Sequence, residues 1–387
     1  MRPFSRSTFI RSGLLMVCSA LAAALYSPKA KSQNASEATP GSDRLKTLSK
    51  GFNLEHWRRT APTDGFYTQK TLQQYRRLGL TYTRLPVVLS KSLDDSRSSV
   101  TKTDFLRSLD NVLEPSFLST LDEIIEMHVQ AELGIILAPF GHPPELYTDP
   151  ELTARFADFW KALATHLSST NPEKVFLQVM NEPAAETPQA WDPVQLELIQ
   201  AIRSGAPNHT IIASANLRVA PKEWSQVRAL PLGQVVADQN LVYDFHFYEP
   251  ITFTHQGATW GADTWQFMKD VPYPATPAAV APILAGIQNP KAKAEVEDYG
   301  AENWNQEKVA RSLSTVTSWA RNQGVRIICS EFGVYPQSAP RASRLRYLKD
   351  VREVLEFYGI GWGHWFRLDV FDDEVMQALG LTPLTRL

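Results

Sequence analysis

Cysteine is scarce in this chain of 387 residues, which contains only Cys18 and Cys329. Because Cys18 lies in an N-terminal segment that we expect to be removed, no internal disulfide is expected in the mature chain. Apolar side chains nevertheless make up 43% of the sequence, which is enough for a large core. A disordered chain and a small disulfide-stapled scaffold are therefore excluded.

The sequence also lacks the common motifs of several enzyme classes. It has no GxSxG turn, no P-loop, no HExxH and no paired CxxC, and its eight histidines are scattered without metal-ligand spacing. We therefore expect neither a metal nor another cofactor. Cys329 stands two residues before Glu331 in an apolar run, so we interpret it as an inert core thiol rather than a redox group.

Basic runs are absent as well. Removal of residues 1–32 takes away five positive charges and no negative one, which changes the formal net charge from −2 to −7. A negative chain without basic runs is a poor ligand for nucleic acid or anionic lipid, so we expect neither as a partner. A neutral polymer fits the charge better. No apolar stripe indicates an oligomer, so we expect a monomer.

One apolar run stands at the N-terminus. Arg2, Arg6 and Arg11 precede the run 14–25, which is typical of a secretory signal peptide. It is too short for a spanning helix, which needs about 20 apolar residues. We expect residues 1–32 to be a cleaved signal peptide and the protein to be secreted or periplasmic, with an uncleaved membrane anchor as the alternative. Residues 33–44 are expected as a polar linker, and residues 45–387 as one catalytic domain.

From residue 50 onward, short apolar runs alternate with helical patterns. The runs cover 51–57, 81–88, 133–140, 174–183, 210–217, 240–250, 325–334 and 359–368. Helical patterns cover 69–78, 114–128, 150–167, 193–203, 304–322 and 342–358. Eight strands, mostly separated by helices, predict an α/β fold, namely a (β/α)8 TIM barrel in a single domain. A doubly wound open sheet is the alternative, but no glycine-rich phosphate turn follows the first strand.

Polar and aromatic side chains stand where these runs end. In a barrel such residues meet at the C-terminal face, where the chemistry of this fold takes place. A buried Arg84–Glu331 pair has a purely structural interpretation, but two carboxylates on opposed strands favour a reaction. The residues are Arg84, Asn181, Glu182, His246, Tyr248, Glu331, Trp362 and Trp365.

The two carboxylates suit the hydrolysis of a glycosidic bond. Glu182 ends the fourth run and Glu331 the seventh, so they face each other across the mouth of an eight-stranded barrel. One carboxyl group protonates the leaving oxygen, while the other attacks the sugar or activates water. A separation of about 5–5.5 Å predicts retention of configuration, and about 6.5–9.5 Å predicts inversion.

Four motifs together resemble the cellulase-like family 5 glycoside hydrolases of the 4/7 superfamily. They are RLPV at 84–87, VMNEP at 179–183, HFYEP at 246–250 and CSEFGV at 329–334, and the resemblance extends over 51–367. It implies a (β/α)8 barrel that cleaves β-glycosidic bonds with retention and without a cofactor.

The resemblance also implies a role for each strand-end residue. Glu182 matches the general acid/base and Glu331 the nucleophile. Asn181 matches the residue that binds the sugar 2-hydroxyl, and Arg84 and Tyr248 match the groups that hydrogen-bond the nucleophile.

Three further matches are aromatic. His246 matches the histidine beside the acid/base, and Trp365 matches the tryptophan under the sugar at the cleavage point, with Trp362 as the less favoured candidate.

Asp244 alternates with His246 along the sixth strand, where it either orients that histidine or caps a loop. The family usually has a histidine directly after strand three. This chain has His142 several residues later, which we interpret either as a subsite residue or as a loop residue.

The segment between Glu249 and Glu302 is too long for an ordinary strand-to-helix connection. Long loops are usually functional or disordered. We favour a functional interpretation, in which aromatic side chains stack on flat sugar faces, over a surface excursion held by its own tryptophans. The candidates are Trp260, Trp265 and His255, together with Trp57 after the first strand. We interpret His56, next to Trp57, in the same way as His142, either as a subsite residue or as a loop residue.

The sequence thus predicts a retaining endo-β-glycosidase that acts on a β-linked polysaccharide or oligosaccharide, with a β-glucan favoured. Mannan, xyloglucan, a β-1,3-glucan and the bacterium's own exopolysaccharide are the alternatives within the same mechanism. A polysaccharide-binding protein without catalysis is less favoured, because both carboxylates are present.

Overall fold

The computed structural model describes residues 41–54, 68–91, 100–216, 238–365, 369 and 372–383. The expected signal peptide, most of the expected linker, and the candidate residues His56 and Trp57 lie outside these described residues. Within them, no helix combines the length and the apolar character that crossing a bilayer requires.

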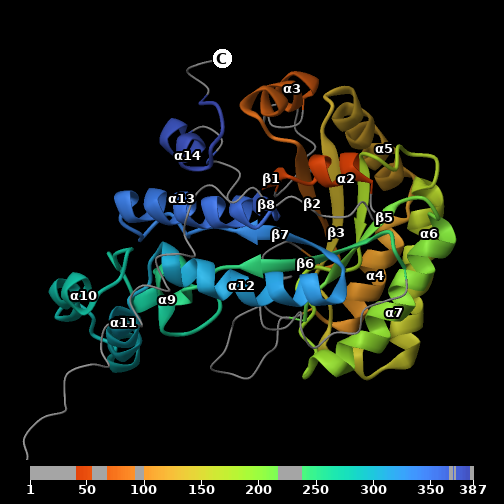
Figure 1. Cartoon of the computed structure of the whole chain (residues 1–387). Helices are drawn as coiled ribbons and strands as arrows, with labels where there is room; N and C mark the ends of the chain where they lie inside the picture. Colours follow the sequence, from red (N-terminus) through yellow and green to blue (C-terminus); the bar gives the residue numbers. More distant parts are fainter. Residues whose placement is uncertain are drawn as a thin grey trace, which may run out of the picture. The chain divides into compact units, whose positions relative to one another are not determined.

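Eight parallel strands close into a barrel in chain order (Figure 1). Because β1 pairs with both β2 and β8, the sheet has no free edge. This confirms the predicted (β/α)8 barrel and excludes the doubly wound sheet. The strands are β1 (Lys50–Asn53), β2 (Tyr82–Val88), β3 (Gly134–Phe140), β4 (Val175–Gln178), β5 (Thr210–Ser214), β6 (Leu241–Phe247), β7 (Arg326–Phe332) and β8 (Gly361–His364).

Helices connect the strands and lie around the outside of the barrel (Figure 1). All six predicted helical stretches are present, together with two further helices, α14 and α4, of which α4 was not predicted. The helices are α3 (Gln69–Leu78), α4 (Lys102–Val112), α5 (Pro115–Gln130), α6 (Pro150–Leu167), α7 (Pro188–Gly205), α12 (Gln306–Gln323), α13 (Arg341–Phe357) and α14 (Asp373–Ala378).

The helix boundaries follow from capping residues. The Thr68 hydroxyl accepts a hydrogen bond from the N–H of Thr71 at the start of α3, and Gly79 ends that helix with a φ of 101°. Asp149 caps α6 and precedes a proline, which lacks the N–H that a first helical residue leaves unpaired. These signals are local in the sequence, so the predicted bounds of α3 and α6 agree with the structure residue for residue.

An inner apolar layer fills the barrel below its polar mouth. Tyr82 lies two residues before Arg84 on β2, and its ring is fully buried. Only glycine fits at position 51, because a Cβ there would lie 2.2 Å from this ring. The layer consists of Leu48, Tyr82, Ile136, Phe176, Ile212, Val242 and Ile328.

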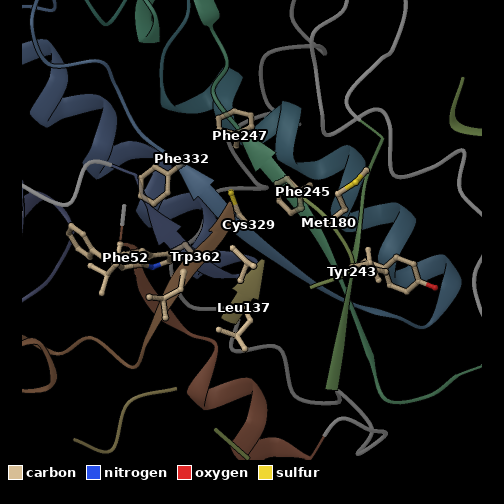
Figure 2. Packing of buried hydrophobic residues seen from close by; sticks show 14 of the residues in the cluster. Phe52, Leu137, Met180, Tyr243, Phe245, Phe247, Cys329, Phe332 and Trp362 are labelled. Carbon is tan, nitrogen blue, oxygen red and sulfur yellow. The ribbon is translucent and has the colours of Figure 1, made fainter. Parts of the chain in front are cut away.

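A larger apolar core lies between the strands and the surrounding helices. Figure 2 shows part of it, with Cys329 among the aromatic rings of Phe245, Phe332 and Trp362. Burial raises the pKa of the Cys329 thiol well above its usual value. The thiol is therefore protonated and unreactive at neutral pH, as expected for a core cysteine.

The fold begins before the predicted end of the linker. Helix α2 (Ser42–Thr47) contains residues 42–44, which were assigned to that linker. Arg44 donates to Glu173 at 2.7 Å and to the carbonyl oxygen of Asn208 at 2.9 Å. The boundary at residue 44 is therefore corrected, because these contacts attach α2 to the barrel.

The long segment after β6 is folded rather than a bare loop. It contains α9 (Ile251–Thr254), the 3-10 turn η5 (Trp265–Phe267), α10 (Pro277–Leu284) and α11 (Pro290–Glu302). Its core includes Tyr273 and Tyr299, whose hydroxyls donate to Asp350 at 3.1 Å and to the carbonyl oxygen of Pro272 at 2.7 Å. The segment is thus a small helical insertion in the connection between β6 and α12.

Candidate active site

Side chains from several strand ends come together at the C-terminal face of the barrel. Strands β6 and β7 place His246 directly beside Glu331 in the pairing register. Contacts described below join the other members to this pair. They are Arg84 of β2, Asn181 and Glu182 in the turn after β4, Tyr248 after β6, and Trp365 after β8.

Glu331 is a buried carboxylate with a donor on each oxygen. Its side chain is 5% exposed, and Arg84 donates to Oε1 at 2.6 Å. The hydroxyl of Tyr248 donates to Oε2 at 2.9 Å. Burial and the charge of Glu331 raise the pKa of Tyr248 well above its usual value, so this hydroxyl keeps its proton and acts as a donor.

Arg84 uses its guanidinium to join four side chains. It is fully buried, and besides Glu331 it donates to Gln178 at 2.7 Å, to Asn181 at 2.7 Å and to Asn53 at 2.9 Å. Since acceptors surround the planar group on several sides, its orientation is fixed. Gln178 and Asn53 were not identified from the sequence. The available signal was a neutral polar residue inside an otherwise apolar strand.

His246 lies between the two predicted catalytic carboxylates. Its Nδ1 is 2.9 Å from Oε1 of Glu182 and 3.4 Å from Oε2 of Glu331. Burial alone would lower the pKa of His246. The charge of Glu331 and the hydrogen bonds to Asp244 and Glu182 outweigh burial and raise this pKa to about 10. The ring is therefore an imidazolium at neutral pH.

The pKa of Glu331 reflects two opposing effects. Burial raises it above the usual value for a glutamate. The positive charges of His246 and Arg84 oppose this rise, while the negative charge of Glu182 adds to it. Arg84 therefore favours the ionised form of Glu331, but it does not bring the pKa below the usual value.

Glu182 sits in a strained turn that two aromatic residues support. Its φ is 43°, in the left-handed region that residues other than glycine rarely adopt. Its side chain is 33% exposed, far more than that of Glu331. Tyr147 accepts a hydrogen bond from the N–H of Ala184 at 2.6 Å, and Nε2 of His142 lies 3.4 Å from the carbonyl oxygen of Glu182. His142 thus contacts the main chain of the turn. Tyr147 was not identified from the sequence.

The geometry also bears on metal binding. One oxygen of Glu182, a ring nitrogen of His246 and one oxygen of Glu331 lie within 4.8 Å of one another, close enough to ligate a cation. However, Arg84 already neutralises Glu331 at 2.6 Å, and the charged ring of His246 has no lone pair to offer. The set is therefore a poor metal site.

The two tryptophans of the last strand region occupy different places. Trp365 lies at the mouth, where it stacks on Phe140 at 6.2 Å between ring centres and shares an apolar cluster with Tyr248. Trp362 is fully buried and donates from its indole nitrogen to Glu356 of α13 at 3.3 Å. Trp362 is therefore a core residue, and its assignment to the substrate site is corrected.

The insertion after β6 approaches the site through His255. The ring of His255 lies edge-on to Tyr248 at 5.2 Å and packs against Trp265 at 4.5 Å. Trp265 packs inside the insertion against His255 and Gly261 and is 6% exposed, so its assignment as an open sugar platform is corrected. Trp260 is half-buried and lies edge-on to Tyr335, four residues beyond Glu331, at 4.7 Å. Trp260 stays a candidate platform.

Comparisons with known proteins agree with this architecture. Endoglucanase C of Acetivibrio thermocellus is 26% identical over 314 residues, which are 81% of this chain and 86% of that enzyme. Endoglucanase 3 of Fibrobacter succinogenes is 25% identical over 83% of this chain, and the chain spans about half of that enzyme's length, 49%. The structure of Cel5A from Thermotoga maritima with cellobiose superposes with a TM-score of 0.63 at 22% identity, covering 87% of this chain and 99% of that one.

The family comparison is more specific than these likenesses. The chain matches the Cellulase family, glycosyl hydrolase family 5, over residues 42–367. This range includes all eight strands and every residue of the site described above. The chain therefore belongs to glycosyl hydrolase family 5 and is a glycoside hydrolase.

Proposed function

We propose that this protein is a retaining endo-β-glucanase, with Glu182 as the general acid/base and Glu331 as the nucleophile. The observation that carries the proposal is the pair of carboxylates after β4 and in β7, with one oxygen of each within 4.8 Å of the other. This spacing favours direct attack by one carboxylate, because an inverting enzyme needs a wider gap to hold a water molecule. The names of the similar endoglucanases support a β-glucan as substrate.

In the first half of the reaction, Glu331 attacks the anomeric carbon as the bond to the leaving oxygen breaks. The proton of Glu182 goes to that oxygen, and the electron pair of the broken bond leaves with it. Arg84 and Tyr248 hold the two oxygens of Glu331, which fixes the direction of attack. The partial exposure of Glu182 lets it reach a leaving group in the cleft.

In the second half, water hydrolyses the glycosyl ester. Glu182 is now ionised and takes a proton from the attacking water, whose oxygen bonds to the anomeric carbon as the ester bond to Glu331 breaks. Both carboxyl groups then have their starting protonation. Two displacements at the same carbon give net retention of configuration.

The remaining site residues are assigned to substrate binding. Asn181 is fixed by Arg84 and would bind the sugar hydroxyl next to the reacting carbon. Trp365 is only 8% exposed, but it lies in the apolar cluster beside Tyr248 of the site and is assigned to sugar contact there, with Trp260 on the insertion as a second candidate. His142 is assigned to the support of the Glu182 turn, since its contact is with the main chain.

Other β-linked polymers remain alternatives within the same mechanism. Mannan, xyloglucan, a β-1,3-glucan and an exported polysaccharide of the same cell differ at the subsites, not at the two carboxylates. Binding without catalysis is disfavoured, since a binding protein would not need a nucleophile held by both Arg84 and Tyr248.

We further propose that the protein is exported, on the basis of the signal-like segment 1–32 and the polar linker that ends before Ser42. We also propose that it acts as a monomer, because no apolar stripe in the sequence indicates an oligomer. N-terminal sequencing of the protein from the culture medium or periplasm is expected to give a start near residue 33. A start at Met1 in a membrane fraction would instead show an uncleaved anchor.

The function is tested by product analysis on soluble β-glucans, mannan and xyloglucan. The wild-type protein is expected to cut β-1,4-glucan internally, with a fast loss of viscosity, and Glu331→Gln is expected to abolish cleavage. Glu297→Gln on the exposed surface of α11 is the matched control and should retain full activity. Cleavage of mannan alone would change the substrate and keep the mechanism. Undiminished cleavage by Glu331→Gln would refute the proposed nucleophile.

A further inference from the structure

The reaction as described gives no role to Asp244, although this carboxylate lies next to the site. Asp244 is 2% exposed, on β6. Its Oδ1 accepts from the N–H of Ser330 at 2.9 Å. Its Oδ2 accepts from the Ser330 hydroxyl and from Nε2 of Gln178, both at 2.7 Å, and lies 3.4 Å from Nε2 of His246.

Each oxygen of Asp244 accepts a hydrogen bond from a group that can only donate, which is the arrangement that a buried carboxylate needs. Gln178 accepts from Arg84 through its Oε1, so the amide must turn its NH2 group toward Asp244. The N–H of Ser330 is also a donor by its nature. Because both oxygens of Asp244 accept hydrogen bonds from fixed donors, neither needs a proton, and the buried negative charge has its hydrogen bonds satisfied.

The contacts form a closed circuit around the mouth of the barrel. From Glu331 it passes to Arg84, from there through Gln178 to Asp244, and then to His246, whose Nδ1 lies 3.4 Å from Glu331 again. Cations and anions alternate in this circuit, with Arg84 and His246 positive and Asp244 and Glu331 negative. Ser330 bridges one step, since its hydroxyl lies 3.2 Å from Nε2 of His246.

We propose that Asp244 is a positioning residue that keeps His246 charged and in place between the two catalytic carboxylates. During the first half of the reaction, Glu331 loses its negative charge and Glu182 gains one. The imidazolium of His246 is then in contact with the charged side chain both before and after this step. This inference rests on the proposed roles of Glu182 and Glu331.

The number of charges supports this role. Before the reaction, Glu182 carries the proton, so two cations face the two anions Asp244 and Glu331. After the first half, Glu331 is a neutral ester and Glu182 is ionised, so two cations again face two anions. His246 contacts Glu182 at 2.9 Å and Glu331 at 3.4 Å, so it stabilises both states without moving. Without Asp244, two cations would share one anion, and His246 would lose its proton more readily.

The groups that face His246 come from four elements. Asp244 and Tyr248 belong to β6 and the residues after it, and Glu331 to β7. Glu182 follows β4, and Arg84 of β2 acts through Glu331. Glu331, Asp244 and Glu182 each raise the pKa of His246. Loss of one nearby opposite charge is expected to lower this pKa by about 1 to 3 pH units.

The test is an NMR titration of histidine ring nitrogens in ¹⁵N-histidine-labelled protein, wild type against Asp244→Asn. The His246 signal is identified by its absence in His246→Gln. In the wild type, His246 should remain an imidazolium up to about pH 9, and in Asp244→Asn it should titrate at clearly lower pH. The ratio of variant to wild-type kcat should also fall between pH 6 and pH 9, because only the variant loses the imidazolium there.

Two further variants keep the test decisive. Asp350→Asn alters another buried aspartate, on α13 and bonded to Tyr273, and it should leave the His246 titration unchanged. Ser330→Ala removes the bridging hydroxyl but keeps the charge of Asp244, so it should lower the pKa of His246 less than Asp244→Asn does. If Asp244→Asn fails to fold, Ser330→Ala serves as the test. An unchanged His246 titration in both site variants would overturn the inference. The NMR measurement needs no substrate, so it stands apart from a failure of the proposed glucanase activity.

Discussion

Replacement of Arg84 by alanine tests how the site stabilises a buried nucleophile. The guanidinium is fully buried and donates to Glu331, Gln178, Asn181 and Asn53 at 2.6 to 2.9 Å. Arg84→Ala therefore leaves a carboxylate inside the protein with one of its two cations removed. It also leaves three amide oxygens without a donor.

The expected cost is large. Removal of one partner from a buried ion pair typically destabilises a protein by about 3–5 kcal/mol, because the remaining charge stays desolvated. The retained imidazolium of His246 and the Tyr248 hydroxyl favour the lower end of that range. An exposed pair provides the contrast. Arg155 and Asp110 lie 3.4 Å apart with half or more of each side chain exposed, and their separation should cost less than about 1 kcal/mol.

The cost should depend on pH in a defined direction. Arg84 lowers the pKa of Glu331, so its loss raises a pKa that burial has already raised. A raised pKa means that the folded protein binds this proton more tightly than the unfolded chain. The stability that the variant loses is therefore greatest at high pH, and part of it returns as the pH falls and Glu331 takes up its proton.

Urea unfolding followed by tryptophan fluorescence at pH 7 and pH 5 measures this effect. Arg84→Ala should lose about 3 kcal/mol or more at pH 7 and less at pH 5, whereas Arg155→Ala should show neither change. A loss below about 1 kcal/mol at pH 7 would refute the argument. An equal loss at both pH values would show that packing, rather than the charge of Glu331, sets the cost.

Three other substitutions have distinct expected outcomes. Glu182→Ala should slow substrates with poor leaving groups far more than activated aryl glycosides, whose first step needs no acid; an equal loss on both, measured by kcat/KM, would contradict the acid role. Trp362→Ala should lower the free energy of unfolding in urea by about 3–5 kcal/mol and leave the kcat/KM of the folded fraction unchanged. Trp365→Ala should instead lower kcat/KM, and the reverse pattern would exchange the roles of the two tryptophans. Gly51→Ala should prevent stable folding, since its Cβ would lie 2.2 Å from the Tyr82 ring, whereas Gly286→Ala, with no atom nearer than 3.4 Å, should be tolerated in a thermal melt.

The sequence was sufficient for the barrel and for the members of the site that end strands. Glu182 and Glu331 could be identified because a parallel barrel brings the C-terminal ends of all strands to one face. Arg84 lies inside β2, four residues before its last residue, and could be identified as the one charged residue of the run 81–88. A charged side chain at the end of an apolar run is also conspicuous. Both features are local, so no knowledge of the tertiary contacts was needed.

The network behind the site could not be found in this way. Gln178 and Ser330 are neutral residues inside apolar strands, and such residues are common in ordinary cores. Their importance arises from the register that brings β4, β6 and β7 together, since both donate to Asp244. The spacing of Asp244 from His246 indicates that the two residues lie on the same face of β6. Spacing alone does not show whether Asp244 orients His246 or caps a loop.

The positions of the aromatic residues were even harder to predict from the sequence. Trp362 and Trp365 are three residues apart, and only the structure separates a core tryptophan from one at the mouth. The pairing register shifts between Cys329 and Phe332, so positions on β7 do not carry over to β8 by counting. Trp265 was proposed as an open platform because it lies in a long insertion, but the insertion folds around it.

The most direct test of the account is to trap the glycosyl-enzyme with an activated 2-deoxy-2-fluoro-β-cellobioside and locate the label by peptide mass spectrometry. The account predicts one cellobiosyl group on the peptide that contains Glu331, with the same label in Glu182→Ala and none in Glu331→Gln. A label on another carboxylate, or an inverted product from unlabelled enzyme that turns over glucan, would contradict it.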